Sequence, residues 1–137
     1  MLKREREYLQ ASRRGFLATS ARRRPAVVPA CFCLKGDVIY TAIDRKPKGH
    51  QLARLSNVLS NPSVAFLVDR YSEDWTELSY LLLHGDAHLV KDEGEAEAAR
   101  ELLRERYPQY RWLKLDGCPI LEIKVHESKF WAFGKQD

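Results

Sequence analysis

The chain has 137 residues, of which 45% are hydrophobic, and a formal net charge of +4. This length and composition are typical of one soluble globular domain, so we expect a single domain over residues 1–137. No apolar run reaches the roughly 18–20 residues that a membrane-spanning helix needs, which excludes a helical membrane span. Glu5 and Glu7 argue against a transit peptide, and we expect a cytoplasmic location.

The positive charge is concentrated near the N-terminus. Residues 1–24 hold eight Lys and Arg against two Glu, a local charge of +6, so the remaining residues sum to −2. Such a run could face an anionic ligand, a nucleic acid or an acidic patch on a partner subunit. The alternative is a solvated helix face followed by a basic loop.

The first half of the chain predicts a short helix and three strands, over residues 3–12, 15–21, 26–34 and 38–43. Pro29 inside the second strand indicates an edge position or a place where no hydrogen-bond donor is needed, because proline donates no hydrogen bond to a neighbouring strand. Residues 35–37, Lys-Gly-Asp, are typical of a tight hairpin turn. Cys31 and Cys33 lie two apart in one predicted strand, so both thiols are expected on one face, as buried structural groups.

Helices are predicted next over 50–61 and 92–107, and strands over 63–69, 76–90, 119–125 and 129–134. Asp92 and Glu95 form a capping-box-like start for the later helix. Gly85 within the longest strand indicates a bulge or bend. His84 and His88 share a strand face, but two histidines without a third ligand are more typical of ordinary residues than of a metal site. Six or seven strands joined by hairpins favour a mainly β (α+β) fold, an antiparallel small barrel with helices outside.

Several anion-binding features follow the strand at 38–43. Thr41 lies near the strand end, and Arg45, Lys46 and Lys48 follow it in a turn. Phosphate groups bind to cations and to the N–H groups at a helix start, which the next helical segment offers. These features predict a phosphate site, and a plain basic turn is the alternative.

The order of residues through this region is distinctive: Tyr40, Thr41, Lys46, Lys48, Leu52, Leu55, Asn57, Asn61 and Pro62. It resembles the flavin-binding segment of the pyridoxamine 5′-phosphate oxidase-like split-barrel superfamily. The stretch 15–32 resembles the first hairpin of that superfamily, and 125–134 resembles the strand whose Trp reaches the cofactor. The stretch 68–90, with its Asp-Trp-Thr element, resembles the subgroup that depends on the deazaflavin coenzyme F420.

The resemblance implies an antiparallel six- to seven-stranded split β-barrel with flanking helices, of the FMN-binding type. It implies an oxidoreductase with FMN or F420 as cofactor, in a homodimer that holds the cofactor at its interface. Such a cofactor carries the hydride to or from a small organic substrate, so no catalytic side chain is expected. The implied cofactor-binding residues are Val28, Pro29, Ala30 and Cys31 beside the ring, Tyr40, Thr41, Arg45, Lys46 and Lys48 at the strand end and turn, and Trp131, which the second subunit often supplies.

Two departures limit what the resemblance implies. Pro47 precedes Lys48, where the oxidase has an Arg-Lys pair, and the oxidase's C-terminal Arg cluster for its substrate is missing. Vitamin B6 oxidation is therefore not carried over. The anionic tail of F420 is longer than the phosphate of FMN, and Arg22–Arg24 or Arg13 and Arg14 could line its path.

Two alternatives to an oxidoreductase stay open. One is a small basic β-barrel that binds single-stranded nucleic acid, which fits less well because the aromatic residues are not interleaved with the cations. The other is a cofactor-storage or sensing protein with the same barrel and no turnover. Trp75, in an acidic loop, could stack on a substrate or cofactor, or it could plug a barrel end.

Overall fold

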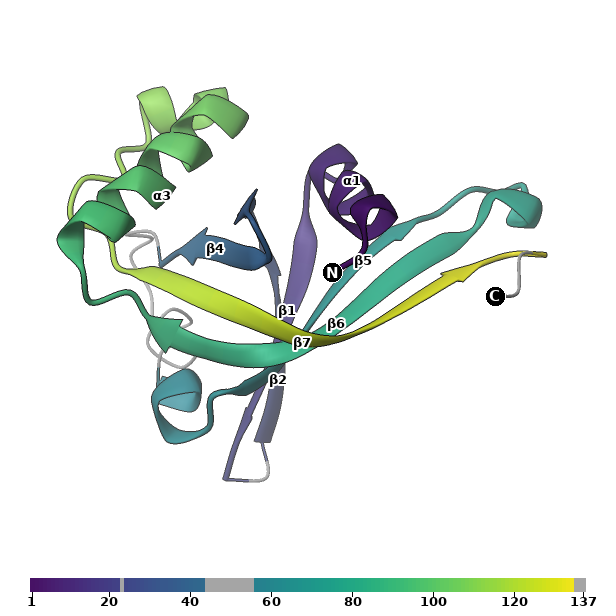
Figure 1. Ribbon diagram of the computed structural model, residues 1–137, viewed down its shortest axis with the longest axis horizontal. Coiled ribbons are helices and arrows are strands. Elements are labelled where there is room, and N and C mark those ends of the chain that lie inside the picture. The colour runs from purple at the N-terminus through teal and green to yellow at the C-terminus, as the bar shows by residue number, and fades with distance from the viewer. Residues whose placement is uncertain (23, 44–55, 135–137) are drawn as a thin grey trace.

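The computed structural model describes residues 1–22, 24–43 and 56–134. Within them, seven strands form one antiparallel sheet in the spatial order β2-β1-β5-β6-β7-β4-β3. Helix α3 lies at the β4 end of the sheet, and α1 stands between α3 and the far ends of β5 and β6 (Figure 1). The elements are α1 Lys3–Ala11, β1 Gly15–Ala21, β2 Arg24–Ala30, β3 Cys33–Lys35, β4 Val38–Ala42, β5 Ser63–Arg70, η1 Trp75–Glu77, β6 Ser79–Leu89, α3 Glu93–Arg106, η2 Pro108–Arg111 and β7 Ile120–Ala132.

An open antiparallel sheet flanked by helices confirms the predicted split-barrel type of fold. The sheet does not close on itself, because β2 and β3 are its two edges. Pro29 lies in β2, so the predicted edge position is confirmed. Gly36 has a φ of +61° in the turn between β3 and β4, a conformation that glycine adopts without strain. None of the helices in the described ranges is long and apolar enough to span a membrane.

The predicted irregularity at Gly85 is a β-bulge between β6 and β7. His84 faces Glu127 and Gly85 faces Val125, which leaves His126 as an extra residue on β7. A Cβ added at Gly85 would lie 2.4 Å from the Lys124 carbonyl oxygen. The close approach of the two backbones at this bulge therefore requires glycine.

The predicted strand over 26–34 is wrong in one respect, because it is broken into β2 and β3. Cys31 and Phe32 belong to neither strand. Their backbone groups bond instead to side chains: the Cys31 carbonyl to Thr41, and the Phe32 N–H to the Tyr107 hydroxyl. The break also undoes the predicted alternation, so Cys31 is exposed while Cys33 is buried.

The predicted separate last strand over 129–134 is also wrong. Those residues up to Ala132 continue β7, which is 13 residues long. The physical reason is the partner strand, since β6 pairs with β7 from Ser79 opposite Ala132 to Leu89 opposite Leu121. Because β6 is long, β7 stays paired with it along residues 121–132, although the sequence alone shows two separate apolar patterns.

Two hydrophobic clusters hold the sheet from opposite sides. One gathers residues of α1 with inward residues of the central strands: Tyr8, Leu9, Leu17, Phe32, Phe66, Leu81, Leu83, Leu121 and Ile123. The other packs α3 on the β4 end of the sheet: Tyr40, Ala96, Ala99, Leu103, Tyr107, Leu115 and Ile120. Ile120 and Leu121 are neighbours in β7 and serve different clusters, because adjacent strand residues point to opposite faces. Asp92 accepts a hydrogen bond from the Glu95 N–H at 2.8 Å, which confirms the predicted start of α3.

Arg106, in the last turn of α3, ties that helix to the end of α1. Its guanidinium donates hydrogen bonds to the backbone carbonyls of Leu9, Gln10 and Ser12. It also lies over the Phe32 ring, 4.9 Å from the ring centroid. Carbonyls in the last turn of a helix lack partners within that helix. Arg106 therefore caps α1 from a segment that lies far away in the sequence.

Replacing Arg106 with Ala is expected to lower the free energy of unfolding by about 2–3 kcal/mol, because several charge-assisted hydrogen bonds are lost at once. Arg104→Ala is a matched control on the same helix. The partners of Arg104 are the exposed carboxylates of Glu97, Glu101 and Asp116, and exposed ion pairs contribute at most about 1 kcal/mol. Urea denaturation measures both variants, and equal losses would contradict the capping role.

Candidate functional site

The end of β2 and the end of β4 meet at one point. Thr41 is buried, and its hydroxyl donates a 2.7 Å hydrogen bond to the carbonyl oxygen of Cys31. Along the predicted ring strand, Pro29 and Cys31 are exposed, Val28 is half-buried and Ala30 is buried. The structure thus brings the predicted ring strand and the predicted strand-end hydroxyl into direct contact.

Tyr40 points away from this contact. Its side chain is buried beneath α3, and its hydroxyl donates a 2.8 Å hydrogen bond to Oε2 of Glu95. Burial raises the pKa of Tyr40, and the adjacent Glu95 carboxylate raises it further. Tyr40 and Thr41 therefore serve opposite faces of β4: the first holds α3, and the second holds the ring strand.

The helical residues 56–60 are attached to β1 by two amides. Asn57 donates from Nδ2 to Oγ1 of Thr19 at 3.1 Å, and Asn61 donates from Nδ2 to the Ser20 carbonyl oxygen at 2.9 Å. Both asparagines belong to the residue order that carried the family resemblance, and in the structure they place this helix. Several predicted residues lie outside the described ranges: Arg23, Arg45, Lys46, Lys48, Leu52 and Leu55.

A cavity of about 780 Å³ lies between the turn that joins β1 to β2 and residues 56–60. Its lining consists of Ala21, Arg22, Arg24, Pro25, Ala26, Ser56, Asn57 and Ser60. Guanidinium, hydroxyl and amide groups of this kind donate hydrogen bonds to anions. The sequence placed Arg22 and Arg24 along the path of an anionic tail but did not single out Ser56 and Ser60. Their spacing of four residues, which puts both on one helix face, was the available signal.

Trp131 lies apart from the ring strand, on a protruding arm that we define as residues 69–80 and 130–134 (Figure 1). It stacks on Tyr80 with ring centroids 5.7 Å apart and an interplanar angle of 21°. Thr41 pairs with Leu121 of β7, ten residues before Trp131, which corresponds to roughly 30 Å along an extended strand. Within one chain, Trp131 therefore lies far from Thr41.

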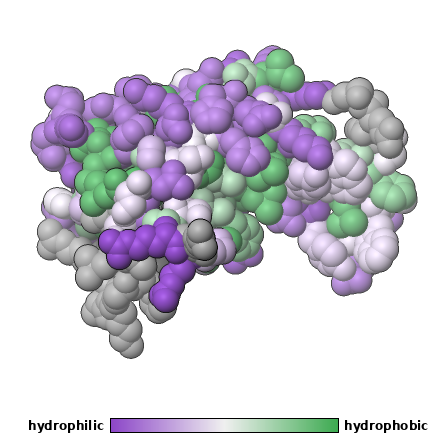
Figure 2. Space-filling view, turned by 90° about the horizontal axis from the view of Figure 1, so that it is seen from below, coloured by the Kyte–Doolittle hydropathy of each residue, from purple (hydrophilic) through white to green (hydrophobic). Residues whose placement is uncertain are grey.

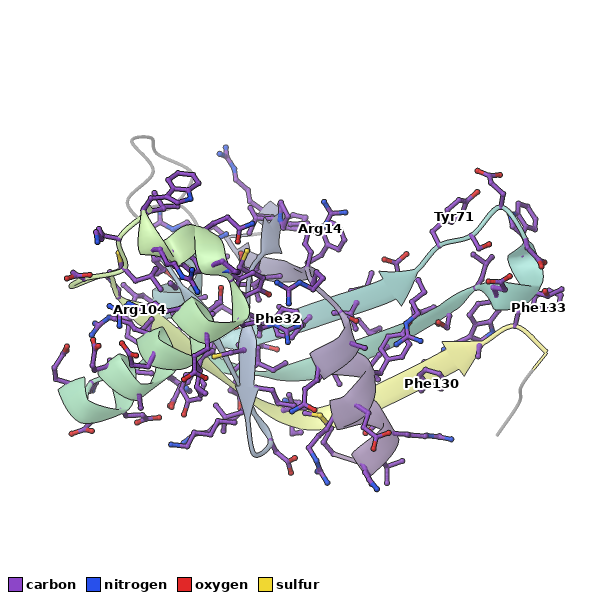
Figure 3. All side chains as sticks on the ribbon, turned by 90° about the horizontal axis from the view of Figure 1, so that it is seen from above. Arg14, Phe32, Tyr71, Arg104, Phe130 and Phe133 are labelled. Atoms are coloured by element: carbon purple, nitrogen blue, oxygen red, sulfur yellow. The ribbon has the colours of Figure 1, made fainter. Side chains whose placement is uncertain are left out.

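Aromatic side chains are exposed along the arm. Figure 3 shows Tyr71 and Phe133 at its outer part, and pale and green side chains gather at this end of the molecule, to the right in Figure 2. The exposed fractions are 66% for Tyr71, 64% for Trp75, 36% for Trp131 and 47% for Phe133. Trp75 is therefore open to solvent in this chain and does not plug a barrel end.

The tip of the arm has a defined local structure. Oδ1 of Asp74 accepts hydrogen bonds from the Thr76 N–H at 3.1 Å and from the Thr76 hydroxyl at 2.7 Å. These hydrogen bonds lower the pKa of the Asp74 carboxyl. The Phe133 N–H donates a hydrogen bond to the Leu78 carbonyl oxygen at 3.0 Å, which holds Phe133 against the tip. The exposed aromatic residues are thus presented by an ordered turn.

The cysteines are free thiols with different surroundings. Cys33 and Cys118 are buried, whereas Cys31, which the sequence predicted to be buried on the same face as Cys33, is exposed. Burial raises the pKa of the Cys33 thiol to about 12. In the part of the chain that the structure describes, no cluster of His, Cys, Asp or Glu could hold a metal ion. His84 and His88 are both exposed on the solvent face of β6.

Comparison with known proteins gives a family and a shared fold. The family model described as pyridoxamine 5'-phosphate oxidase matches residues 4–129. No curated protein matches the chain.

Similar solved structures cover nearly the whole chain. A conserved hypothetical protein of Mycobacterium tuberculosis is 18% identical, with a TM-score of 0.77 over 96% of this chain and 85% of that one. An FAD-binding protein of Mesorhizobium loti is 18% identical, with a TM-score of 0.73 over 95% and 94%. The heme storage protein HutZ of Vibrio cholerae is also 18% identical, with a TM-score of 0.73 over 97% and 95%. At these identities the likeness shows the fold alone.

Proposed function

Because the chain belongs to the pyridoxamine 5'-phosphate oxidase family, we propose that it is an oxidoreductase that binds FMN or the deazaflavin F420. The observation that carries this proposal is that the edge strand β2, together with Cys31 after it, has an uncharged exposed end and a basic end. Val27, Pro29 and Cys31 are exposed at every second residue, so they share a face. Arg22 and Arg24 stand at the other end, beside the cavity. A cofactor with an apolar ring and an anionic chain has the same polarity.

The dimensions of this surface suit such a cofactor. Cys31 is the seventh residue after Arg24, roughly 23 Å away along an extended strand. The ring would lie against the uncharged part of the strand, and the arginines of the cavity would hold the anionic chain. When bound, the cofactor supplies the hydride chemistry, while these residues bind and orient it. The reaction class is hydride transfer to or from a small organic substrate.

We also propose that the protein is a homodimer in which the arm of one copy covers the exposed face of β2 in the other. The arm supports this proposal because Tyr71, Trp75 and Phe133 are largely exposed in the single chain. Aromatic residues of this kind are enriched in protein interfaces and dominate their energetics. The same arrangement would bring Trp131 of the second copy to the cofactor, whereas within its own chain Trp131 lies far from Thr41.

The first test is to titrate the purified protein with FMN and with F420 and to monitor each titration by visible absorption. We expect one of the two to bind, and we expect Lys48→Ala to raise its dissociation constant by about tenfold or more, since a charge-assisted contact to phosphate is lost. Lys35→Ala is the matched control, because Lys35 is an exposed lysine of the β3–β4 hairpin and its removal should leave binding unchanged. Arg22→Ala with Arg24→Ala should weaken binding of F420 more than binding of FMN.

Other outcomes would overturn the proposal in different ways. A heme Soret band without binding of either cofactor would point to the kind of function named for the Vibrio cholerae neighbour. Salt-sensitive binding of an oligonucleotide, with no coloured cofactor, would favour the nucleic-acid module. Tight cofactor binding without turnover of any reducible substrate would leave a storage or sensing protein.

A further inference from the structure

The break between β2 and β3 is held by side chains from two other elements. Thr41, from β4, donates its hydroxyl proton to the Cys31 carbonyl oxygen. Tyr107, which caps α3, accepts the Phe32 N–H at its hydroxyl oxygen at 3.1 Å. The same hydroxyl lies 3.1 Å from the Phe32 carbonyl oxygen and 3.0 Å from that of Arg13, to either of which it can donate. We call this arrangement of Thr41 and Tyr107 around residues 31 and 32 the junction clamp.

The junction clamp lies in a tightly packed place. Thr41 is 1% exposed, Phe32 0% and Tyr107 6%. The Phe32 ring packs edge-on against Phe66 with ring centroids 5.1 Å apart, and the Arg106 guanidinium also lies over the Phe32 ring. Backbone groups in such a place must be bonded, because a buried polar group without a partner costs about 1–3 kcal/mol. The two hydroxyls therefore define where the chain leaves β2.

Because of the clamp, Cys31 and Cys33 do not lie on the same face. An unbroken strand would place Cys31 and Cys33 on one face, yet Cys31 is exposed and Cys33 is buried. The clamp thus ends the exposed row of Val27, Pro29 and Cys31 and sends the chain inward at Phe32. The position of this row depends on two residues that do not belong to it.

The bond to Cys31 also limits what Thr41 can do directly. A threonine hydroxyl has one proton to donate, and a phosphate dianion takes only donors. While the Thr41 proton is held by the Cys31 carbonyl oxygen, it cannot also be donated to a phosphate. A buried hydroxyl bonded in this way affects a ligand indirectly, by positioning the strand to which it is bonded.

We propose that Thr41 and Tyr107 are positioning residues, which set the exposed face of residues 28–31 against the cofactor ring by fixing the junction at Cys31 and Phe32. This inference rests on the proposed function for its ligand and on the contacts above for its geometry. It differs from the role that the family resemblance implies for Thr41, which is a place beside the phosphate. It also gives Tyr107, at the end of a distant helix, a part in cofactor binding.

Thr41→Val and Tyr107→Phe test the clamp because each removes one hydroxyl and keeps the shape of the side chain. The first measurement needs no cofactor: native protein is treated with a thiol reagent near pH 8. In the unaltered protein we expect Cys31 to react fast and Cys33 to stay unreactive, since it is buried with a raised pKa. In either variant we expect Cys33 to react at least tenfold faster, and Cys33→Ala identifies its share of the signal. Thr41→Ser, which restores the hydroxyl, should return the original rate.

The second measurement is the dissociation constant of whichever cofactor the unaltered protein binds. We expect about a tenfold increase in Thr41→Val and in Tyr107→Phe, with recovery in Thr41→Ser, while far-ultraviolet circular dichroism stays unchanged. Faster Cys33 labelling with unchanged affinity would overturn the positioning role. Unchanged labelling would overturn the clamp itself. If the unaltered protein binds neither FMN nor F420, the proposed function fails and the cofactor role with it, while the labelling rates still decide the clamp.

Discussion

The proposed homodimer is expected to dissociate into monomers when Trp75→Ser and Phe133→Ser are combined. Trp75 is 64% exposed and Phe133 47% exposed on the arm of the single chain, so their replacement removes less packing from the monomer than from the proposed interface. Buried aromatic anchors each contribute on the order of 2 kcal/mol to an interface. The double variant should therefore raise the dimer dissociation constant on the order of 1,000-fold. Sedimentation velocity over a range of concentrations measures this shift.

Trp112→Ser is the control for this prediction. Trp112 is 74% exposed, but it lies next to η2, near α3, and not on the arm. Its replacement should leave the dimer intact, which separates the effect of the arm from a general loss of surface aromatic residues. A monomeric unaltered protein, or a dimer equally stable in both variants, would contradict the arm's proposed role. Cofactor binding by a monomer would show in addition that Trp131 of a second copy is not needed.

Gly85→Ala is expected to lower the free energy of unfolding by about 3 kcal/mol, which is the upper end of what overpacking costs. The new Cβ would lie 2.4 Å from the Lys124 carbonyl oxygen, 3.0 Å from the Lys124 carbonyl carbon and 3.2 Å from Cγ2 of Ile123. Two of these atoms are backbone in the paired strand, so β6 and β7 must move apart at the bulge. Urea denaturation provides the measurement.

Gly36→Ala gives the matched comparison. Gly36 has a φ of +61°, but a Cβ there meets nothing within 4 Å. Its replacement therefore tests backbone strain without a clash and should cost only about 1 kcal/mol. Similar losses at both positions would mean that the bulge can open to admit a side chain, and the tight approach of β6 to β7 would then not be a requirement of the fold.

Sequence patterns predicted the parts of the fold that depend on neighbours in the chain. The start of α3 at Asp92 and the bulge at Gly85 each rest on one or two local residues. The break at Cys31 could not be predicted in this way. It is made by Thr41, which lies ten residues further along, and by Tyr107, which lies 75 residues beyond Phe32. Such contacts exist only after the sheet and α3 have come together.

The candidate site was predictable to a similar extent. The residue order from Tyr40 to Pro62 indicated the family, and the match over residues 4–129 bears this out. The individual roles depend on tertiary contacts, and the structure shows Tyr40 bonded to Glu95 on the opposite face from Thr41. The contacts that the resemblance implies for the cofactor itself stay predictions.

The place of β7 in the sheet has a consequence for synthesis on the ribosome. It pairs with β6 on one side and with β4 on the other, although Glu122 is made about 80 residues after its partner Tyr40. Until residues 120–132 emerge, the four-stranded part β2-β1-β5-β6 and the hairpin β3-β4 each present an unpaired edge. Open edges pair readily with other chains. A nascent chain stalled before residue 120 should therefore depend on chaperones, because only the insertion of β7 pairs the open edges of β6 and β4.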